Sequence, residues 1–149
     1  MRHIAYLTGV WIMMLISPLL ASTANQSIGK DRVNVRSKPS LTSKILFQAY
    51  LGYPIHIEKQ NNNWVYVTDW KHAAGWIYKP MVSKVQTAVI LAEHANIRRG
   101  PGRQKPVVAR ASRGEIYKVF AKKGAWVKVG YYTENEVVGW VRHDLVWGD

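Results

Sequence analysis

Histidines, carboxylates, serines and cysteines are the side chains that could catalyse a reaction or hold a metal in this chain. Four histidines follow the N-terminal apolar segment, and none has an H-E-x-x-H or comparable ligand spacing: His56, His72, His94 and His143. The chain has no cysteine, which excludes a thiolate nucleophile and a cysteine-ligated metal. No serine lies in a G-x-S-x-G motif, and the nine Asp and Glu residues are scattered, many beside a cation. We therefore expect no catalytic residue, no metal and no cofactor, and we interpret the chain as a binding protein rather than an enzyme.

The segment WVYVT carries aromatic side chains at alternate positions. Trp64 and Tyr66 alternate with Val65 and Val67, so in a strand the two rings lie on the face opposite to the valines. A sugar ring or a peptide can lie against aromatic rings that are exposed in this way. The alternative is that Trp64 and its counterpart Trp126 cover the hydrophobic edge of their own domain. The candidate ligand contacts of this kind are Trp64, Tyr66, Trp70, Trp126, Lys128 and Tyr132.

Arginines border two short turns that follow an Asn-x-Arg motif. Arg36 and Arg98 point away from the core if Val35 and Ile97 point inward, and each could hold a carboxylate through two hydrogen bonds. The alternative, which we favour, is that each arginine pairs with a backbone carbonyl or a nearby acid and fixes the turn. The other basic residues around the second turn form the best candidate patch for attracting a polyanion: Arg99, Arg103, Lys105, Arg110 and Arg113.

The N-terminus and the net charge together suggest where the chain acts. Residues 1–24 have a basic start, an uncharged apolar stretch and small residues at Ser22 and Ala24, which predicts a secretory signal peptide cut after Ala24. The alternative is an uncleaved segment that anchors the protein in the membrane. The formal net charge of +12 favours anionic partners, and the predicted export argues against nucleic acid as the partner. We therefore expect a periplasmic or extracellular protein that binds an anionic polymer of the cell envelope, unless the charge only keeps the protein soluble.

The chain contains two copies of one pattern. Asn34 matches Asn96 in a register of sixty-two residues, and Val35, Arg36, Pro39, Gly52, Trp64, Val65 and Val67 match in the same register. The second copy then gains two residues, so that Gly75-Trp76-Ile77 aligns with Gly139-Trp140-Val141. A small insertion between strands is typical of a duplicated domain, because hairpin loops vary in length.

Each copy alternates apolar and polar residues with period two, which predicts short antiparallel strands. Four or five such strands in roughly 55 residues favour a small, strongly bent barrel. Trp76 and Trp140 each follow a glycine, and we expect the glycine to allow close backbone approach while the indole covers the end of the barrel. We also expect the two copies to touch each other rather than swing freely.

These motifs resemble those of the bacterial Src-homology-3 domain family. The resemblance rests on RVNVRSKPSLTSKI, NNNWVYV and GWI in the first copy and on ANIRRGPGRQKPVV, GAWVKV and VGWVRHDLV in the second. It implies an all-β protein of two tandem five-stranded barrels, without catalytic activity, whose ligand is peptidoglycan. The first copy has Lys38 where the second has Gly100, so we expect its first turn to differ in shape. An alternative function is a protein–protein interaction module of the envelope, with or without a membrane tether. The predicted organisation is a signal peptide at 1–24, a first domain at 25–82, a linker at 83–93 and a second domain at 94–149.

Overall fold

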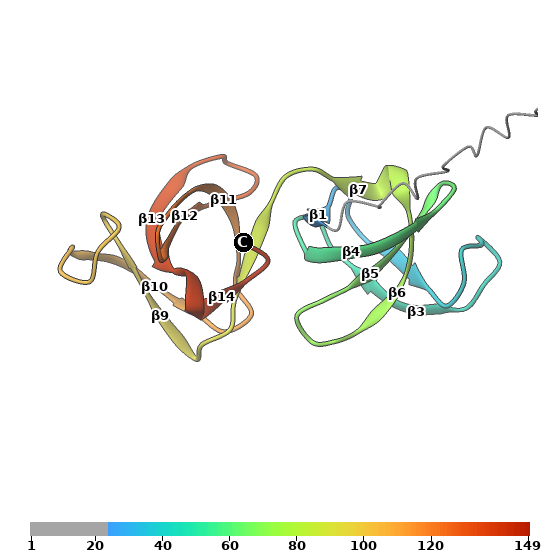
Figure 1. The fold of residues 1–149 in the computed structure, drawn as a ribbon, viewed down its shortest axis with the longest axis horizontal. Helices are drawn as coiled ribbons and strands as arrows, with labels where there is room; N and C mark the ends of the chain where they lie inside the picture. The colour runs from blue at the N-terminus through green and yellow to red at the C-terminus, as the bar shows by residue number, and fades with distance from the viewer. Residues whose placement is uncertain (1–23) are drawn as a thin grey trace, which may run out of the picture.

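The computed structural model describes residues 24–149, which form two lobes of β-strands and turns (Figure 1). The described residues contain no α-helix, and no helix among them is long and apolar enough to cross a membrane. Apart from Ala24, the predicted signal peptide lies outside the described residues. The prediction of two all-β domains in tandem is confirmed.

The first lobe, called here the first module, comprises residues 24–83. It is an antiparallel sheet of seven strands in the order β3-β2-β6-β5-β4-β1-β7. A 3-10 helix, η1, follows β6 and leads into the last short strand. The elements are β1 (Ala24–Ile28), β2 (Val33–Arg36), β3 (Ile45–Ala49), β4 (Pro54–Asn61), β5 (Trp64–Thr68), β6 (Ala74–Tyr78), η1 (Lys79–Met81) and β7 (Val82–Ser83).

The second module repeats this order strand for strand, as β10-β9-β13-β12-β11-β8-β14. The two residues that it gains fall in the hairpin between β12 and β13, where the match between the two copies places them. The elements are β8 (Thr87–Ile90), β9 (His94–Arg98), β10 (Val107–Ser112), β11 (Ile116–Lys123), β12 (Trp126–Gly130), β13 (Val137–Arg142), η2 (His143–Leu145) and β14 (Val146–Trp147).

Each module has its own hydrophobic core, made by the inward-facing residues of its sheet. Val65, Val67 and Ile77 are buried in the first core, and Val127, Val129 and Val141 are buried in the second. The alternating pattern of the sequence is the cause, because successive side chains of a strand point to opposite faces. Two separate cores are the organisation that the duplication predicts.

Trp76 and Trp140 lie on the outer faces of their sheets, so the prediction that they cover the ends of the barrels is wrong. Gly75 and Ile77 are buried on the core face, and Trp76 between them therefore points outward. It packs against Tyr66 of the neighbouring strand, with ring centroids 5.3 Å apart.

The glycines before these tryptophans have the role that the sequence predicts. A Cβ on Gly75 would lie 2.9 Å from the carbonyl oxygen of Arg36, and one on Gly139 would lie 2.5 Å from that of Arg98. Only glycine therefore allows β2 to approach β6, and β9 to approach β13, at this point.

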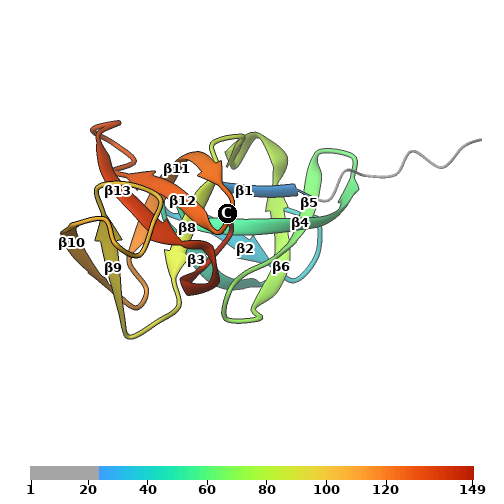
Figure 2. The same ribbon diagram turned by 60° about the vertical axis from the view of Figure 1, so that its left-hand side comes forward.

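The segment predicted as a linker, residues 83–93, is mostly part of the fold. Strand β8 pairs with β11 and β14, and all four of its residues are buried, so the second module begins well before residue 94. Residues 84–86 join the two sheets, and the chain end at β14 returns to the boundary between the lobes (Figure 2). The hydroxyl of Ser27 donates a 2.7 Å hydrogen bond to the carbonyl oxygen of Val85, which ties this joint to the first module.

Candidate ligand-binding grooves

In each sheet, two neighbouring strands are only weakly paired: β2 and β6 in the first module, and β9 and β13 in the second. A single residue pair joins the two strands in each case: Arg36 with Trp76, and Arg98 with Trp140. No further pair joins these strands in the described part of the chain, and a groove lies between them in each module. The 3-10 helix that follows β6 or β13 supplies one more wall residue.

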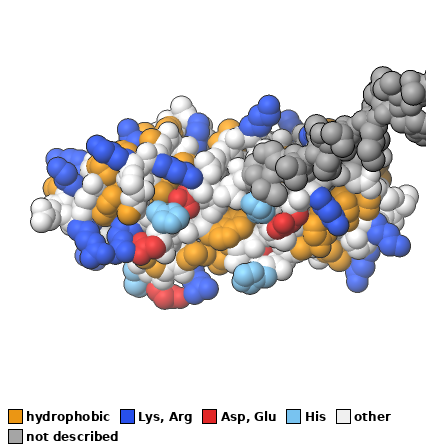
Figure 3. All heavy atoms as spheres, viewed as in Figure 1, with side chains coloured by type: hydrophobic (Ala, Val, Ile, Leu, Met, Phe, Trp, Pro, Cys, Tyr) orange, Lys and Arg blue, Asp and Glu red, His pale blue; other side chains and the backbone are white. Residues whose placement is uncertain are grey.

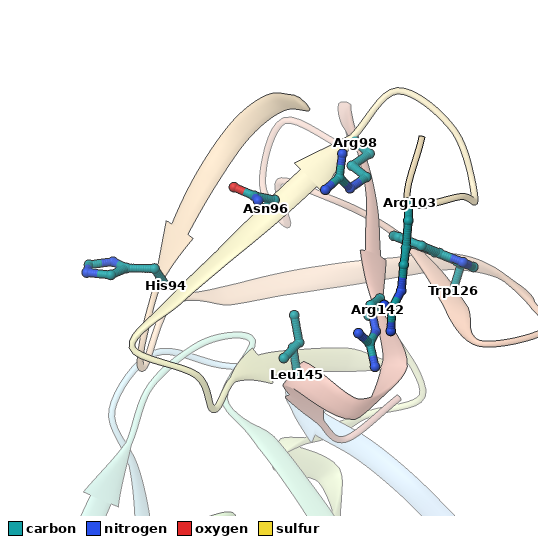
Figure 4. Close-up of a pocket in the computed structure, with 7 residues that line it drawn as sticks. All are labelled: His94, Asn96, Arg98, Arg103, Trp126, Arg142 and Leu145. Atoms are coloured by element: carbon teal, nitrogen blue, oxygen red, sulfur yellow. The ribbon is translucent and has the colours of Figure 1, made fainter. Parts of the chain in front are cut away.

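The first groove has a volume of about 200 Å³ and the second about 270 Å³. Both are open to the surface, and the residues that line the second groove are drawn in Figure 4. The first groove is lined by Asp31, Arg32, Val33, Asn34, Arg36, Leu41, Trp64, Tyr78 and Met81. The second groove is lined by His94, Asn96, Arg98, Arg103, Trp126, Arg142 and Leu145.

The two grooves occupy equivalent positions of the repeat. Every residue that lines the second groove has its repeat counterpart in the first groove, five at a spacing of sixty-two and two at sixty-four. Asn, Arg and Trp are retained at three of these positions, and the other four have changed. The pairs are Arg32 and His94, Asn34 and Asn96, Arg36 and Arg98, Leu41 and Arg103, Trp64 and Trp126, Tyr78 and Arg142, and Met81 and Leu145.

The arginines of the Asn-x-Arg motif fix the turns beside the grooves, as the favoured alternative predicts. Arg36 donates from Nη1 to the carbonyl oxygen of Ser43 at 2.8 Å, and Arg98 donates to that of Lys105 at the same distance. Neither arginine has a carboxylate partner among residues 24–149. Both arginines also line the grooves, so the two roles considered for them are compatible.

The turns after the two motifs have the same backbone hydrogen bonds, so the prediction that they differ in shape is wrong. The backbone N–H of Ser40 donates to the carbonyl oxygen of Lys38 in the first turn, and that of Gly102 donates to the carbonyl oxygen of Gly100 in the second. Two further N–H to carbonyl bonds of each turn correspond in the sixty-two-residue register. Ser37 to Lys44 matches Arg99 to Pro106, and Ser43 to Ser40 matches Lys105 to Gly102. Replacing glycine by lysine is tolerated because Lys38 does not require a left-handed backbone there.

The indole of each groove is half-buried on the outer face of its sheet. Trp64 packs against Tyr78 of β6 with ring centroids 5.6 Å apart and an angle of 58° between the rings. Trp126 faces Arg142 at the equivalent position of the sheet. Each indole therefore forms part of a groove wall.

Guanidinium groups dominate the second groove. Arg103 reaches in from the turn between β9 and β10, and Arg142 reaches toward it from the end of β13 (Figure 4). Arg142 forms an ion pair with Asp144, whereas Arg103 has no carboxylate partner among the described residues. Lys and Arg side chains also gather over the lobe formed by the second module (Figure 3).

Five predicted contact residues lie outside the grooves. Tyr66 and Lys128 lie two residues beyond Trp64 and Trp126 on the same strands, where they contact Trp76 and Trp140 instead of a groove. The ammonium group of Lys128 is 5.9 Å from the Trp140 ring centroid. The others are Trp70, which lies in the hairpin after β5, Arg99, which is exposed beside the second turn, and Tyr132, whose ring packs against Gly52 of the first module.

Sequence reasoning missed the groove residues that come after the glycine–tryptophan pair. Tyr78 and Arg142 are each two positions beyond that tryptophan, on the same outward face of the strand. The two copies align at these positions, and Tyr78 and Arg142 are the cross-strand partners of Trp64 and Trp126.

Other ionisable groups lie outside the grooves. No group of three or more metal-ligating side chains occurs in residues 24–149. Burial, followed by a 2.7 Å hydrogen bond to Asp69, raises the pKa of the Tyr53 hydroxyl above its ordinary value. Burial and a hydrogen bond to Glu115 raise the pKa of Tyr117 in the same way.

Comparisons with known proteins identify both modules. The family described as "Bacterial SH3 domain" matches residues 29–84 and 92–148. A protein of Bacillus subtilis (strain 168) named "Putative N-acetylmuramoyl-L-alanine amidase YrvJ" is 25% identical over 141 residues, which cover 87% of this chain and 27% of that protein. The chain thus spans about a quarter of that relative's length.

Two solved structures from Trichomonas vaginalis are similar at a lower level. NlpC2 is 16% identical with a TM-score of 0.38, covering 86% of this chain and 49% of that one. NlpC1 is 15% identical with a TM-score of 0.39, covering 95% of this chain and 51% of that one.

Proposed function

Because the chain belongs to the bacterial SH3 domain family, we propose that it is an exported, non-enzymatic protein that binds peptidoglycan of the cell envelope through its two grooves. The relative from Bacillus subtilis supports a link to the cell wall, since its name describes an amidase that acts at N-acetylmuramoyl-L-alanine. The chain aligns with only a quarter of that protein, so the amidase activity itself is not carried over.

The observation that carries the proposal is the recurrence of one groove at equivalent positions. Asn, Arg and Trp line both grooves although four other lining positions have diverged. These residue types supply amide hydrogen bonds, a guanidinium and the flat face of an indole. Together they match a ligand that contains peptide amides, carboxylates and sugar rings, as peptidoglycan does.

The composition of the grooves supports binding rather than catalysis. The lining of the first groove includes Asp31 but no histidine, and that of the second includes His94 but no carboxylate. His94 also points away from Arg103 and Arg142 (Figure 4). Neither groove in the described chain therefore pairs a base with a nucleophile in the way that acyl transfer requires.

An exposed apolar edge favours a second candidate function, binding to another envelope protein. Strands β3 and β10 form one edge of each sheet, and Ile45 and Leu46 on β3 are each 45% exposed. Val107 and Val108 on β10 are their repeat counterparts and are similarly exposed. Unpaired strand edges with apolar side chains can accept a strand from a partner.

Sedimentation with purified cell-wall sacculi tests the proposal. We expect the exported protein to pellet with sacculi at low and at physiological salt, and to bind less when Trp64→Ala and Trp126→Ala are combined. Trp70→Ala removes an indole outside the grooves and is the matched control. Thermal melts of each variant verify that it is folded.

Three results would contradict the proposal. Binding that disappears at physiological salt would indicate charge adsorption alone, because such attraction between exposed charges is screened. An equal loss in the Trp70→Ala control would exclude the grooves as the binding site. Absence of sedimentation by the wild-type protein would favour the protein-partner alternative.

A further inference from the structure

We propose that the two grooves have diverged in specificity, so that the second groove binds a carboxylate of the ligand and the first binds an uncharged part. This inference rests on the proposed function and assigns a different chemical group to each groove. It begins from the lining positions that differ between the two copies.

The differences change the charge of one groove in a consistent direction. Leu41 of the first groove corresponds to Arg103 of the second, and Tyr78 corresponds to Arg142. Because the two turns have the same backbone hydrogen bonds, Leu41 and Arg103 begin from equivalent places in the fold. The lining of the second groove therefore contains the guanidinium groups of Arg98, Arg103 and Arg142 and no carboxylate, whereas Asp31 partly offsets the arginines of the first.

Two of the three guanidinium groups are already held in place. Arg98 is fixed by its bond to the carbonyl oxygen of Lys105, and Arg142 by its ion pair with Asp144. Arg103 lies on the same turn as Lys105 and extends toward Arg142 from the opposite wall (Figure 4). Positioned guanidinium groups lose less entropy on binding and present paired N–H donors that match a carboxylate.

Arg103 is the guanidinium of this groove that still needs an anionic partner. Arg142 already has the carboxylate of Asp144, whereas no carboxylate lines the groove itself or pairs with Arg103 in residues 24–149. A ligand carboxylate in the groove would give Arg103 that partner and gain charge-assisted hydrogen bonds from it. Trp126 lines the same groove, so its indole can contact uncharged atoms of the ligand next to the carboxylate.

The first groove has the opposite character. Trp64 and Tyr78 present two tilted rings, and the side chains of Leu41 and Met81 complete an apolar wall. Leu41 is 72% exposed, so its side chain is accessible to a ligand in this groove. A sugar ring or a small aliphatic side chain fits such a surface better than a carboxylate does, since Asp31 also lines this groove.

Titration with two synthetic peptides tests this assignment. The probes are the stem pentapeptide L-Ala-γ-D-Glu-L-Lys-D-Ala-D-Ala with free carboxylates and the same peptide with both carboxylates amidated. The indole N–H signals of Trp126 and Trp64 in nuclear magnetic resonance spectra of the exported protein report on the two grooves separately. We expect the free-carboxylate peptide to shift the Trp126 signal and to bind at least about tenfold more tightly there than the amidated peptide.

The chain supplies its own matched variants. Exchanging Arg103→Leu and Arg142→Tyr places the residues of the first groove in the second, and should abolish the preference for free carboxylates at Trp126. The reverse exchange, Leu41→Arg with Tyr78→Arg, should create a carboxylate-dependent shift at Trp64. Lys30→Leu with Lys71→Tyr removes the same charge at exposed positions of the first module that line neither groove, and should leave the preference at Trp126 unchanged.

Equal binding of the two peptides at Trp126, or an equal effect of the control pair, would overturn the assignment. Glycerol phosphate that binds at Trp126 more tightly than the free-carboxylate peptide would also overturn it, in favour of phosphate. Sacculus sedimentation of the wild-type protein separates this inference from the proposed function. Sedimentation without a peptide preference rejects only the assignment, and a preference without sedimentation rejects only the peptidoglycan proposal.

Discussion

The hydroxyl of Thr87 donates a 2.8 Å hydrogen bond to the carbonyl oxygen of Gly52, across the boundary between the two modules. Thr87 is fully buried, and Gly52 has a φ of +79°, which favours glycine at this turn. The ring of Tyr132 packs against Gly52 from the second module. The predicted contact between the modules is therefore confirmed, and it is made by a buried polar bond as well as by packing.

Thr87→Val should destabilise the protein by about 1–3 kcal/mol, because it leaves the buried carbonyl of Gly52 without its donor. The free energy of unfolding in urea measures the effect. Thr42→Val makes the same chemical change at an exposed position and should have little effect. Similar losses for both variants would show that the bond does not hold the modules together.

Gly139→Ala should destabilise the second module by about 1–3 kcal/mol, because its Cβ would be 2.5 Å from the carbonyl oxygen of Arg98. Gly102→Ala is the matched control, since the nearest atom to its Cβ would be Lys105 Cγ at 3.5 Å. Thermal unfolding monitored by circular dichroism compares the two variants. A lower melting temperature for Gly102→Ala than for Gly139→Ala would be inconsistent with a required close approach of β9 and β13.

The stability should fall as the pH rises above about 10, the ordinary pKa of a tyrosine. The folded state raises the pKa of Tyr53 and Tyr117, so it retains their protons after the unfolded state has released them. This contribution is fully present below the unfolded pKa and is lost as the pH rises through the folded pKa.

Tyr53→Phe provides the measurement for this pH dependence. The variant should be less stable than the wild type near neutral pH, because it lacks the hydrogen bond to Asp69. The difference in unfolding free energy should shrink as the pH is raised above about 10. A difference that stays constant across this range would contradict a raised pKa at Tyr53.

On the proposed export, the mature protein should begin at Asn25, the residue after the predicted cleavage site. In the structure, Asn25 of β1 is paired with His56 of β4. The side-chain amide of Asn25 donates a 3.2 Å hydrogen bond to the backbone carbonyl of Asp149. The predicted cut removes only Ala24 from β1, and a cut further along the chain would remove more of this strand. Intact mass spectrometry of protein recovered from the envelope measures the start, and a mass that includes residues 1–24 would indicate a tethered form instead.

The fold was predictable because its signals are local and occur twice. Alternation in WVYVT and WVKVG identifies strands and their buried faces from neighbouring residues alone. The sixty-two-residue register adds an independent check, since Gly52 and Gly114 both adopt the positive φ that their turns require. The first strands of the two modules, β1 and β8, escaped prediction because they do not carry the repeated motifs.

The site was only partly predictable, because it depends on which outward positions meet. Arg36, Trp64, Arg98, Arg103 and Trp126 could be selected from the sequence by residue type and exposure. Tyr66 and Lys128 share those properties but lie one row away, and Tyr132 is taken by the boundary between the modules.

The sequence by itself determined that the chain has two similar β-domains, which residues face each core and where the basic charge lies. Only the tertiary structure decided that a groove lies beside the single pair that joins β2 to β6, and that Arg142 shares its groove with Arg103. The physical reason is that strand alternation is fixed by neighbours in the chain, whereas a groove depends on the spacing between strands distant in sequence.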